Sequence, residues 1–156
     1  TLVGKADRID RRADGSYAVI DYKTGTPPSP KQVAAGLSPQ LPLEALMLYH
    51  GAFDGLPAGD TTLMEYWQAS GKEDKPLEIK NVASKKNTAS DLRVEAAEGL
   101  RQLIDTYKNP QTAYHSHPRA GILAQGHDYD HLARVREWSV GSDDDDGGED
   151  TGEVEA

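Results

Sequence analysis

The pattern of apolar and polar residues along the chain predicts a small α/β domain with four strands. Two runs rich in β-branched and aromatic residues, at 2–11 and 17–23, flank a short polar segment with an Asp-Gly step, which predicts a β-hairpin. Two further runs predict a third strand at 61–69 and a weaker fourth at 77–82. The strands are separated by helical patterns, so we expect a mixed sheet.

Helices are predicted wherever a capping signal comes before a run of helical periodicity. Three such segments occupy 30–35, 39–51 and about 88–108. The last of them places its apolar residues on one face, as an amphipathic helix that packs on a core does. Residues 109–127 read as loop, and a short closing helix is predicted at 131–138. The fold class is therefore α/β, with a central mixed β-sheet flanked by helices.

Charge and composition separate the C-terminus from the rest of the chain. The last 14 residues, DDDDGGEDTGEVEA, carry eight acidic and no basic side chains, and they offer almost nothing apolar to bury. We therefore expect a folded core over 1–140 and a disordered acidic tail over 141–156. The chain has no cysteine, which excludes disulfides and thiolate metal sites. No apolar run approaches the roughly 20 residues of a membrane span, and a cytoplasmic location is compatible with both observations.

The strongest candidate chemistry lies at the end of the second predicted strand, in the stretch VIDYKTG. Asp21 and Lys23 are two residues apart, so both side chains face the same side of the strand. A three-residue hairpin loop with Gly15 in the left-handed conformation would set Asp7 directly opposite Asp21. A two-residue loop would instead pair Asp7 with Tyr22 and turn the two carboxylates to opposite faces.

The first register creates a repulsive pair of carboxylates, which is stabilised if a cation lies between them. Two converging carboxylates form a hard-oxygen site suited to Mg²⁺ or Mn²⁺. A lysine on the same face could act on an attacking water or on the charge that develops on a phosphate, which suits phosphodiester hydrolysis. The alternative is that Asp21 and Lys23 form an ordinary ion pair on a solvated strand.

The stretch GKADRIDRRADGSYAVIDYKTG resembles the nuclease core of the PD-(D/E)XK superfamily, in particular its RecB-like branch. The matching features are a Gly-x-x-Asp strand ending at Asp7, a hairpin, an Asp-Tyr-Lys strand at 21–23 and a following helix with Gln40. The resemblance implies a restriction-endonuclease-like core and a Mg²⁺- or Mn²⁺-dependent deoxyribonuclease. It also implies specific roles: Asp7, Asp21 and the Tyr22 backbone carbonyl as metal ligands, Lys23 as the catalytic lysine, and Gln40 as an active-site residue near the substrate.

Two stretches, VIDYKTGTPPSPKQVAAGLSPQLPLEA and the later DYDHLARVREW, carry a closer resemblance. They resemble the C-terminal nuclease domain of the AddB family, and the resemblance covers most of 2–138. It implies an exonuclease domain that acts on single strands of DNA fed to it by an AddA-type helicase subunit, in a complex that resects double-strand breaks for recombinational repair. Some members of that family hold an iron–sulfur cluster, which this chain cannot build without cysteine. No membrane partner is implied.

The sequence departs from the family pattern in two places. The residue four positions after Gln40 is Glu44, where the pattern has tyrosine. The family also has an upstream helix that supplies a further acidic or histidine residue, and because this chain starts directly in strand-like sequence we expect it to be a piece of a longer protein that lacks this helix. Two alternatives therefore remain: a catalytically silent nuclease fold that guides DNA or docks a subunit, and another nuclease of the superfamily, such as a phage or repair exonuclease.

Overall fold

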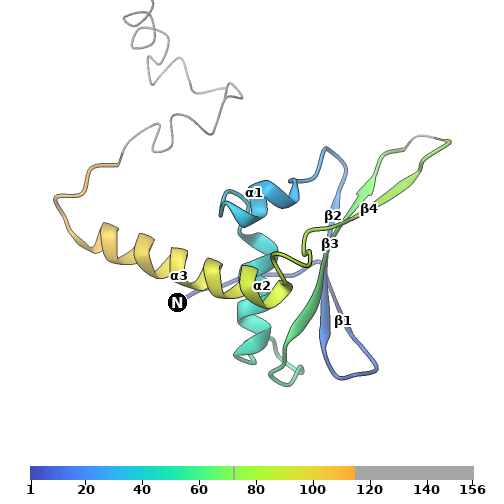
Figure 1. The fold of residues 1–156 in the computed structure, drawn as a ribbon. Helices are drawn as coiled ribbons and strands as arrows, with labels where there is room; N and C mark the ends of the chain where they lie inside the picture. The colour runs from blue at the N-terminus through green and yellow to red at the C-terminus, as the bar shows by residue number, and fades with distance from the viewer. Residues whose placement is uncertain (72, 115–156) are drawn as a thin grey trace, which may run out of the picture. The chain divides into compact units, whose positions relative to one another are not determined.

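The computed structural model describes residues 1–71 and 73–114, and it contains the predicted mixed sheet. The four strands lie in sequence order in one sheet (Figure 1), and they span Arg8–Arg11 (β1), Tyr17–Lys23 (β2), Thr61–Ala69 (β3) and Leu77–Asn81 (β4). Strands β2 and β3 are parallel, whereas the outer pairs β1–β2 and β3–β4 are antiparallel. The parallel pair β2–β3 therefore lies in the middle of the sheet, with one antiparallel strand on each side of it.

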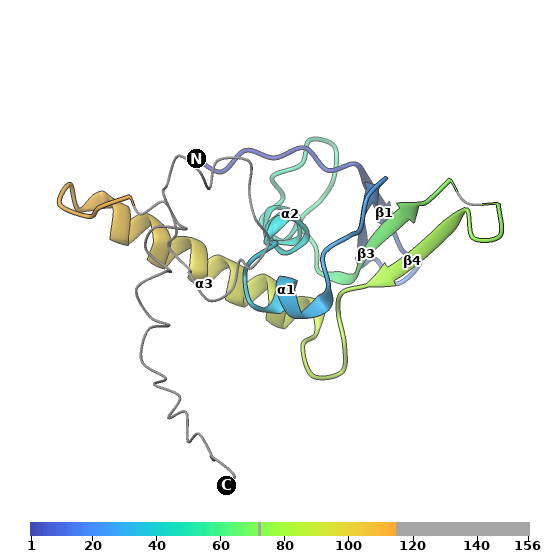
Figure 2. The same cartoon turned by 90° about the horizontal axis from the view of Figure 1, so that it is seen from above.

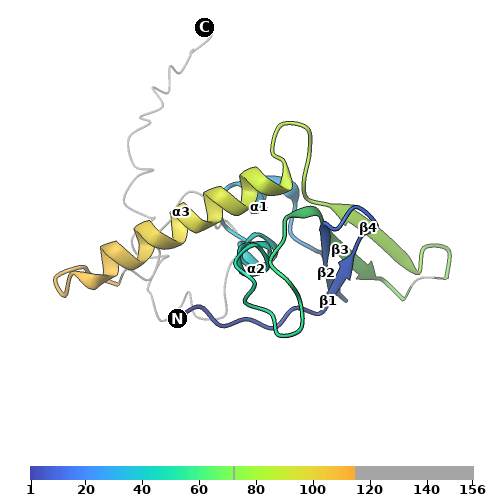
Figure 3. The same ribbon diagram turned by 90° about the horizontal axis from the view of Figure 1, so that it is seen from below.

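Three helices accompany the sheet: α1 (Pro30–Ala34), α2 (Gln40–Tyr49) and α3 (Ala89–Lys108). Helices α1 and α2 form the connection between the parallel strands β2 and β3, as a parallel pair requires. Figures 2 and 3 show all three helices on the same side of the sheet. Within the described residues, the sheet therefore has one face covered by helices and one face without a helix.

The hydrophobic core lies between the helix-covered face of the sheet and helix α2. Helix α2 contributes Leu41, Ala45 and Leu48, whose spacing places them on one face, and each is at most 1% exposed. Strand β3 contributes Met64 and Tyr66, which are equally buried. Helix α3 packs on this core mainly through its first turns, where its two buried residues lie.

The hairpin between β1 and β2 has the three-residue loop, and its register would set Asp7 opposite Asp21 if the ladder continued past Arg8. The Arg12 N–H donates to the Ser16 carbonyl over 2.8 Å, and Gly15 has a φ of +83°, in the left-handed region. The ladder pairs Arg8 with Ile20 and continues in that register toward the loop. The two-residue alternative, which would have separated the carboxylates, is excluded.

The observed elements differ from the predicted ones mainly at their ends. The first strand begins at Arg8 rather than residue 2, because the ladder with β2 does not extend further. Helix α3 begins as predicted, with a reciprocal capping box between Thr88 and Asp91. The predicted helix at 131–138 and the predicted acidic tail lie outside the described residues.

The chain separates into two compact units, Thr1–Pro110 and Gln111–Ala156. All the strands and helices given above belong to the first unit. Of the helices in the described part of the chain, none has the length and apolar character needed to cross a membrane.

Candidate active site

Asp21 is the buried centre of the candidate site. It follows four buried residues of β2 and is itself only 2% exposed, on the face of the sheet that packs against α2. A carboxylate at such a position is costly unless charged or hydrogen-bonding groups compensate it. Its neighbours therefore define what the site can do.

Lys23 supplies the compensating charge from the same face of the same strand. Its Nζ lies 2.6 Å from Asp21 Oδ2, with the lysine side chain 33% exposed and the aspartate side chain 3% exposed. This contact is an ion pair without hydrogen-bond geometry, because Oδ2 has no hydrogen-bond partner among the described residues. An ordinary pair on a solvated strand is thus the wrong interpretation, since the aspartate is removed from water.

Gln40, the first residue of α2, reaches both members of this pair. Its Nε2 donates to Asp21 Oδ1 over 2.7 Å, and its Oε1 accepts a hydrogen bond from Lys23 Nζ over 3.5 Å. The start of α2 is placed there by the turn after β2 and by the packing of the helix on the sheet. The three residues predicted from the motif therefore form one connected cluster.

Glu44 lies one helical turn after Gln40 and joins the same cluster. Its Oε1 accepts a second hydrogen bond from Gln40 Nε2, over 3.2 Å, and the residue is 5% exposed. Burial raises the pKa of the Glu44 carboxyl, and the nearby negative charges of Asp21 and Asp7 raise it further. The sequence identified Glu44 only as a departure from the pattern, whereas the structure places it in the site.

Asp7 approaches the site from the residue just before β1. Its Oδ2 accepts a hydrogen bond from the Tyr22 N–H over 3.1 Å, so the Asp7 carboxylate holds the end of β2 where the regular ladder stops. Asp7 is exposed, and its negative charge is one of the causes that raise the pKa of the Glu44 carboxyl. The structure gives no direct contact between the two aspartates.

The donor set suits a hard divalent cation, since Asp7, Asp21 and the backbone carbonyl of Tyr22 all offer oxygen. Asp21 Oδ2, buried and beside an ammonium, is an atom that a cation would satisfy. Among residues 1–71 and 73–114, however, no three His, Cys, Asp or Glu side chains are already gathered into a group that could hold a metal. The donor chemistry therefore suits such a cation, while the described side chains do not form a ready group of three ligands.

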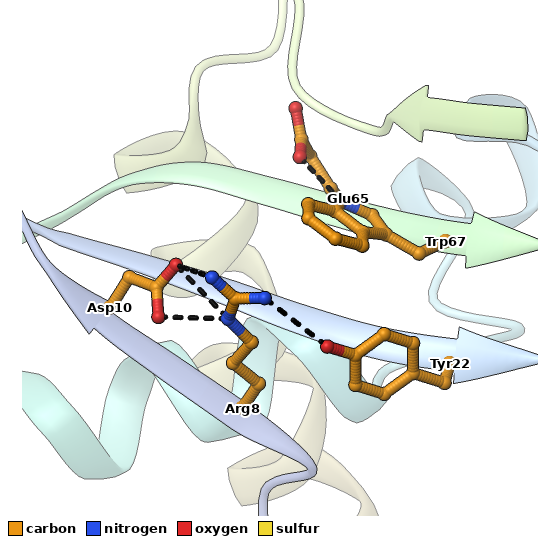
Figure 4. A network of polar contacts seen from close by, with 5 residues as sticks. All are labelled: Arg8, Asp10, Tyr22, Glu65 and Trp67. Atoms are coloured by element: carbon orange, nitrogen blue, oxygen red, sulfur yellow. Dashed lines mark hydrogen bonds and ion pairs between the residues drawn. The ribbon is translucent and has the colours of Figure 1, made fainter. Parts of the chain in front are cut away.

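The opposite face of the sheet carries a second polar network, which sequence reasoning missed (Figure 4). Arg8 donates to Asp10 over 2.8 Å and to the Tyr22 hydroxyl over 3.3 Å, and its guanidinium lies 5.1 Å from the centre of the Trp67 ring. Trp67 in turn donates to Glu65 over 2.9 Å. The sequence feature that could have indicated this network is the alternation of side chains along each strand. This alternation places Tyr22 on the face opposite that of Asp21 and Lys23.

Known proteins provide an independent comparison. The chain is 46% identical over 52 residues to an uncharacterized protein of Rickettsia conorii and 45% identical over 53 residues to one of Rickettsia felis. These segments are 33% and 34% of this chain but only 6% of each relative, so the chain spans a small part of the curated relatives it matches. No solved structure matches the chain significantly.

The sequence profile of the PD-(D/E)XK nuclease superfamily matches residues 1–119, which include every residue of the candidate site. Superfamily membership points to a nuclease, and therefore to a hydrolase. The mixed sheet with its flanking helices is consistent with the core of that superfamily. This chain belongs to the PD-(D/E)XK nuclease superfamily.

Proposed function

We propose that this chain is a metal-dependent deoxyribonuclease domain that hydrolyses phosphodiester bonds. One observation carries the proposal: the buried Asp21 carboxylate is contacted by both Lys23 and Gln40, the residues that the RecB-like pattern has at these positions. A buried charge cluster of this kind is costly for the fold, and such clusters occur preferentially at functional sites.

The residues would divide the chemistry among them. Asp7, Asp21 and the Tyr22 carbonyl would hold Mg²⁺ or Mn²⁺, which when bound lowers the pKa of water and stabilises charge on phosphate. Lys23 would orient the attacking water or stabilise the charge that develops on the phosphate oxygens. Gln40 would hold the Lys23 ammonium and the Asp21 carboxylate in a fixed relation, through hydrogen bonds to each.

The wider role that we propose is that of an AddB-type domain. Such a domain would be an exonuclease on single strands of DNA supplied by an AddA-type helicase subunit, during resection of double-strand breaks in the cytoplasm. Support comes from the resemblance of VIDYKTGTPPSPKQVAAGLSPQLPLEA to that family's nuclease domain. Another nuclease of the superfamily would use the same residues on a different DNA substrate.

The alternative role is a silent nuclease fold that guides DNA or docks a subunit. Two observations favour it: Glu44 stands where the family pattern has tyrosine, and the described residues contain no group of three metal-ligating side chains. It predicts that DNA binding or complex assembly survives the loss of Asp21, and that no cleavage occurs in either form.

Cleavage of end-labelled single-stranded DNA by the purified protein, with Mg²⁺ and with EDTA, tests the proposal. We expect metal-dependent cleavage that Asp21→Asn abolishes. The matched control is Asp54→Asn, which changes an exposed aspartate far from the motif and should leave the rate unchanged. Cleavage that is equal in Asp21→Asn and the unsubstituted protein would contradict the assigned site, and a complete lack of cleavage by the unsubstituted protein would favour the silent fold.

A further inference from the structure

Glu44 has a feature that its hydrogen bond to Gln40 does not explain. Its Oε2 is buried and has no hydrogen-bond partner among the described residues, although Oε1 has one. A buried carboxylate oxygen without a partner carries a desolvation cost that a native fold compensates in some way. Hydrogen bonds between side chains four residues apart, like that between Gln40 and Glu44, are common on exposed helix faces. The hydrogen bond to Gln40 therefore does not explain why Glu44 is buried.

The surroundings of Glu44 are negatively charged. The single amide nitrogen of Gln40 lies between Glu44 and Asp21 and donates to both carboxylates. Asp7 adds a third negative charge that acts on Glu44. Lys23 is the ammonium that the structure places against Asp21.

A hydrated divalent cation held beside Asp21 would give the unpartnered Oε2 of Glu44 a hydrogen-bond donor. Magnesium keeps several of its waters in protein sites, and those waters need acceptors in the protein. The unpartnered carboxylate oxygen of Glu44 is suited to accept a hydrogen bond from such a water.

We infer that Glu44 is a third carboxylate of the cation site and binds the ion through a metal-bound water. The inference rests on the proposed function, because it assumes that Asp7 and Asp21 hold the ion. It accounts for the burial of Glu44 and for its unpartnered Oε2. An acid in this position thus replaces the family's tyrosine with an added negative charge.

Calorimetric titration of the purified protein with Mn²⁺ tests the inference without relying on activity. Glu44→Gln keeps the shape of the side chain and an acceptor for Gln40, but it removes the charge. We expect the Mn²⁺ affinity to fall by about 10–100-fold, the usual effect of losing a group that orients the inner ligands and waters of a metal. Glu95→Gln, which removes the same charge from an exposed position on α3, should leave the affinity unchanged.

The outcomes separate this inference from the proposed function. If Asp21→Asn abolishes Mn²⁺ binding while Glu44→Gln binds as tightly as the unsubstituted protein, Glu44 has no part in the cation site and only the inference is overturned. If Asp21→Asn also binds normally, the metal site itself is wrong.

A second pair of variants covers the case in which Glu44→Gln does not fold. Glu44→Asp and Glu44→Asn have the same shortened length and differ in charge. We expect Glu44→Asp to bind Mn²⁺ more tightly than Glu44→Asn, and equal affinities in the two folded variants would overturn the inference.

Discussion

Replacing Lys23 with alanine should weaken the metal-free fold and, separately, remove catalysis. The side chain of Asp21 is 3% exposed, and Lys23 Nζ lies 2.6 Å from it. Removing one partner of a fully buried ion pair typically costs about 3–5 kcal/mol. Because the Lys23 side chain is one-third exposed and Gln40 still donates to Asp21, we expect a smaller loss in the free energy of unfolding, about 2 kcal/mol.

Mn²⁺ should restore the stability that Lys23→Ala loses, but it should not restore the catalysis. Mn²⁺ placed beside Asp21 would supply the charge that Lys23 no longer provides, so the destabilisation measured by urea unfolding should be larger in EDTA than at saturating Mn²⁺. The rate of DNA cleavage at saturating Mn²⁺ should still fall by about 10²–10⁴-fold, as expected for the loss of a general base or an electrostatic group.

Lys86→Ala is the matched control for Lys23→Ala, since Lys86 is an exposed lysine in the loop before α3. It should leave both the stability and the cleavage rate unchanged. The reasoning is refuted if Lys23→Ala cleaves DNA at the unsubstituted rate, because the lysine would then have no part in the chemistry. Equal stability of Lys23→Ala and the unsubstituted protein in EDTA would refute the energetic role of the ion pair.

The remaining predictions concern the frame that holds the site. Leu48→Ala should lower the free energy of unfolding, measured by urea titration, by about 2–5 kcal/mol, because Leu48 is 1% exposed in the core. The control Leu103→Ala, at a residue 54% exposed, should change it by less than about 0.5 kcal/mol. Gly15→Ala should cost about 1–2 kcal/mol, because its φ of +83° is unfavourable for alanine, and an unchanged unfolding midpoint would contradict the loop geometry. Removing 141–156 should leave the thermal midpoint unchanged, because this acidic segment has almost no apolar residues, and a clear fall in calorimetry would contradict its predicted independence from the core.

Local patterns were sufficient to predict most of the frame. The strands at 17–23 and 61–69 agree with β2 and β3 at both ends, because β-branched and aromatic runs with turn residues on each side leave little ambiguity. Of the two hairpin registers that the sequence left open, the structure has the one whose loop places Gly15 in the left-handed conformation. The first strand was predicted too long, because an apolar pattern does not reveal where a partner strand stops pairing.

The cluster around Asp21 was only partly predictable. Asp21, Lys23 and Gln40 could be named from the motif, and the structure brings them into contact. The position of Glu44 depends on how α2 packs against β2, which is a tertiary contact that no local pattern specifies. Its spacing of four from Gln40 was a usable signal, because residues one turn apart share a helix face.

The network on the other face was not anticipated because its partners come from different strands. The contacts of Arg8 with Tyr22 and with Trp67 join β1 to β2 and β3. Alternation predicts which face each side chain occupies, but the register between strands decides which side chains meet. For β2 and β3 this register is set by the parallel crossover through α1 and α2, and the sequence does not give it directly.

We propose that Asp7 and Asp21 hold a divalent cation in a working nuclease site. The most direct test is a crystal of the protein soaked with Mn²⁺ and measured for anomalous scattering at the manganese absorption edge. We expect an anomalous peak between the carboxylates of Asp7 and Asp21, within bonding distance of both. A map at saturating Mn²⁺ with no peak there, and with Asp21 still paired only to Lys23, would contradict it.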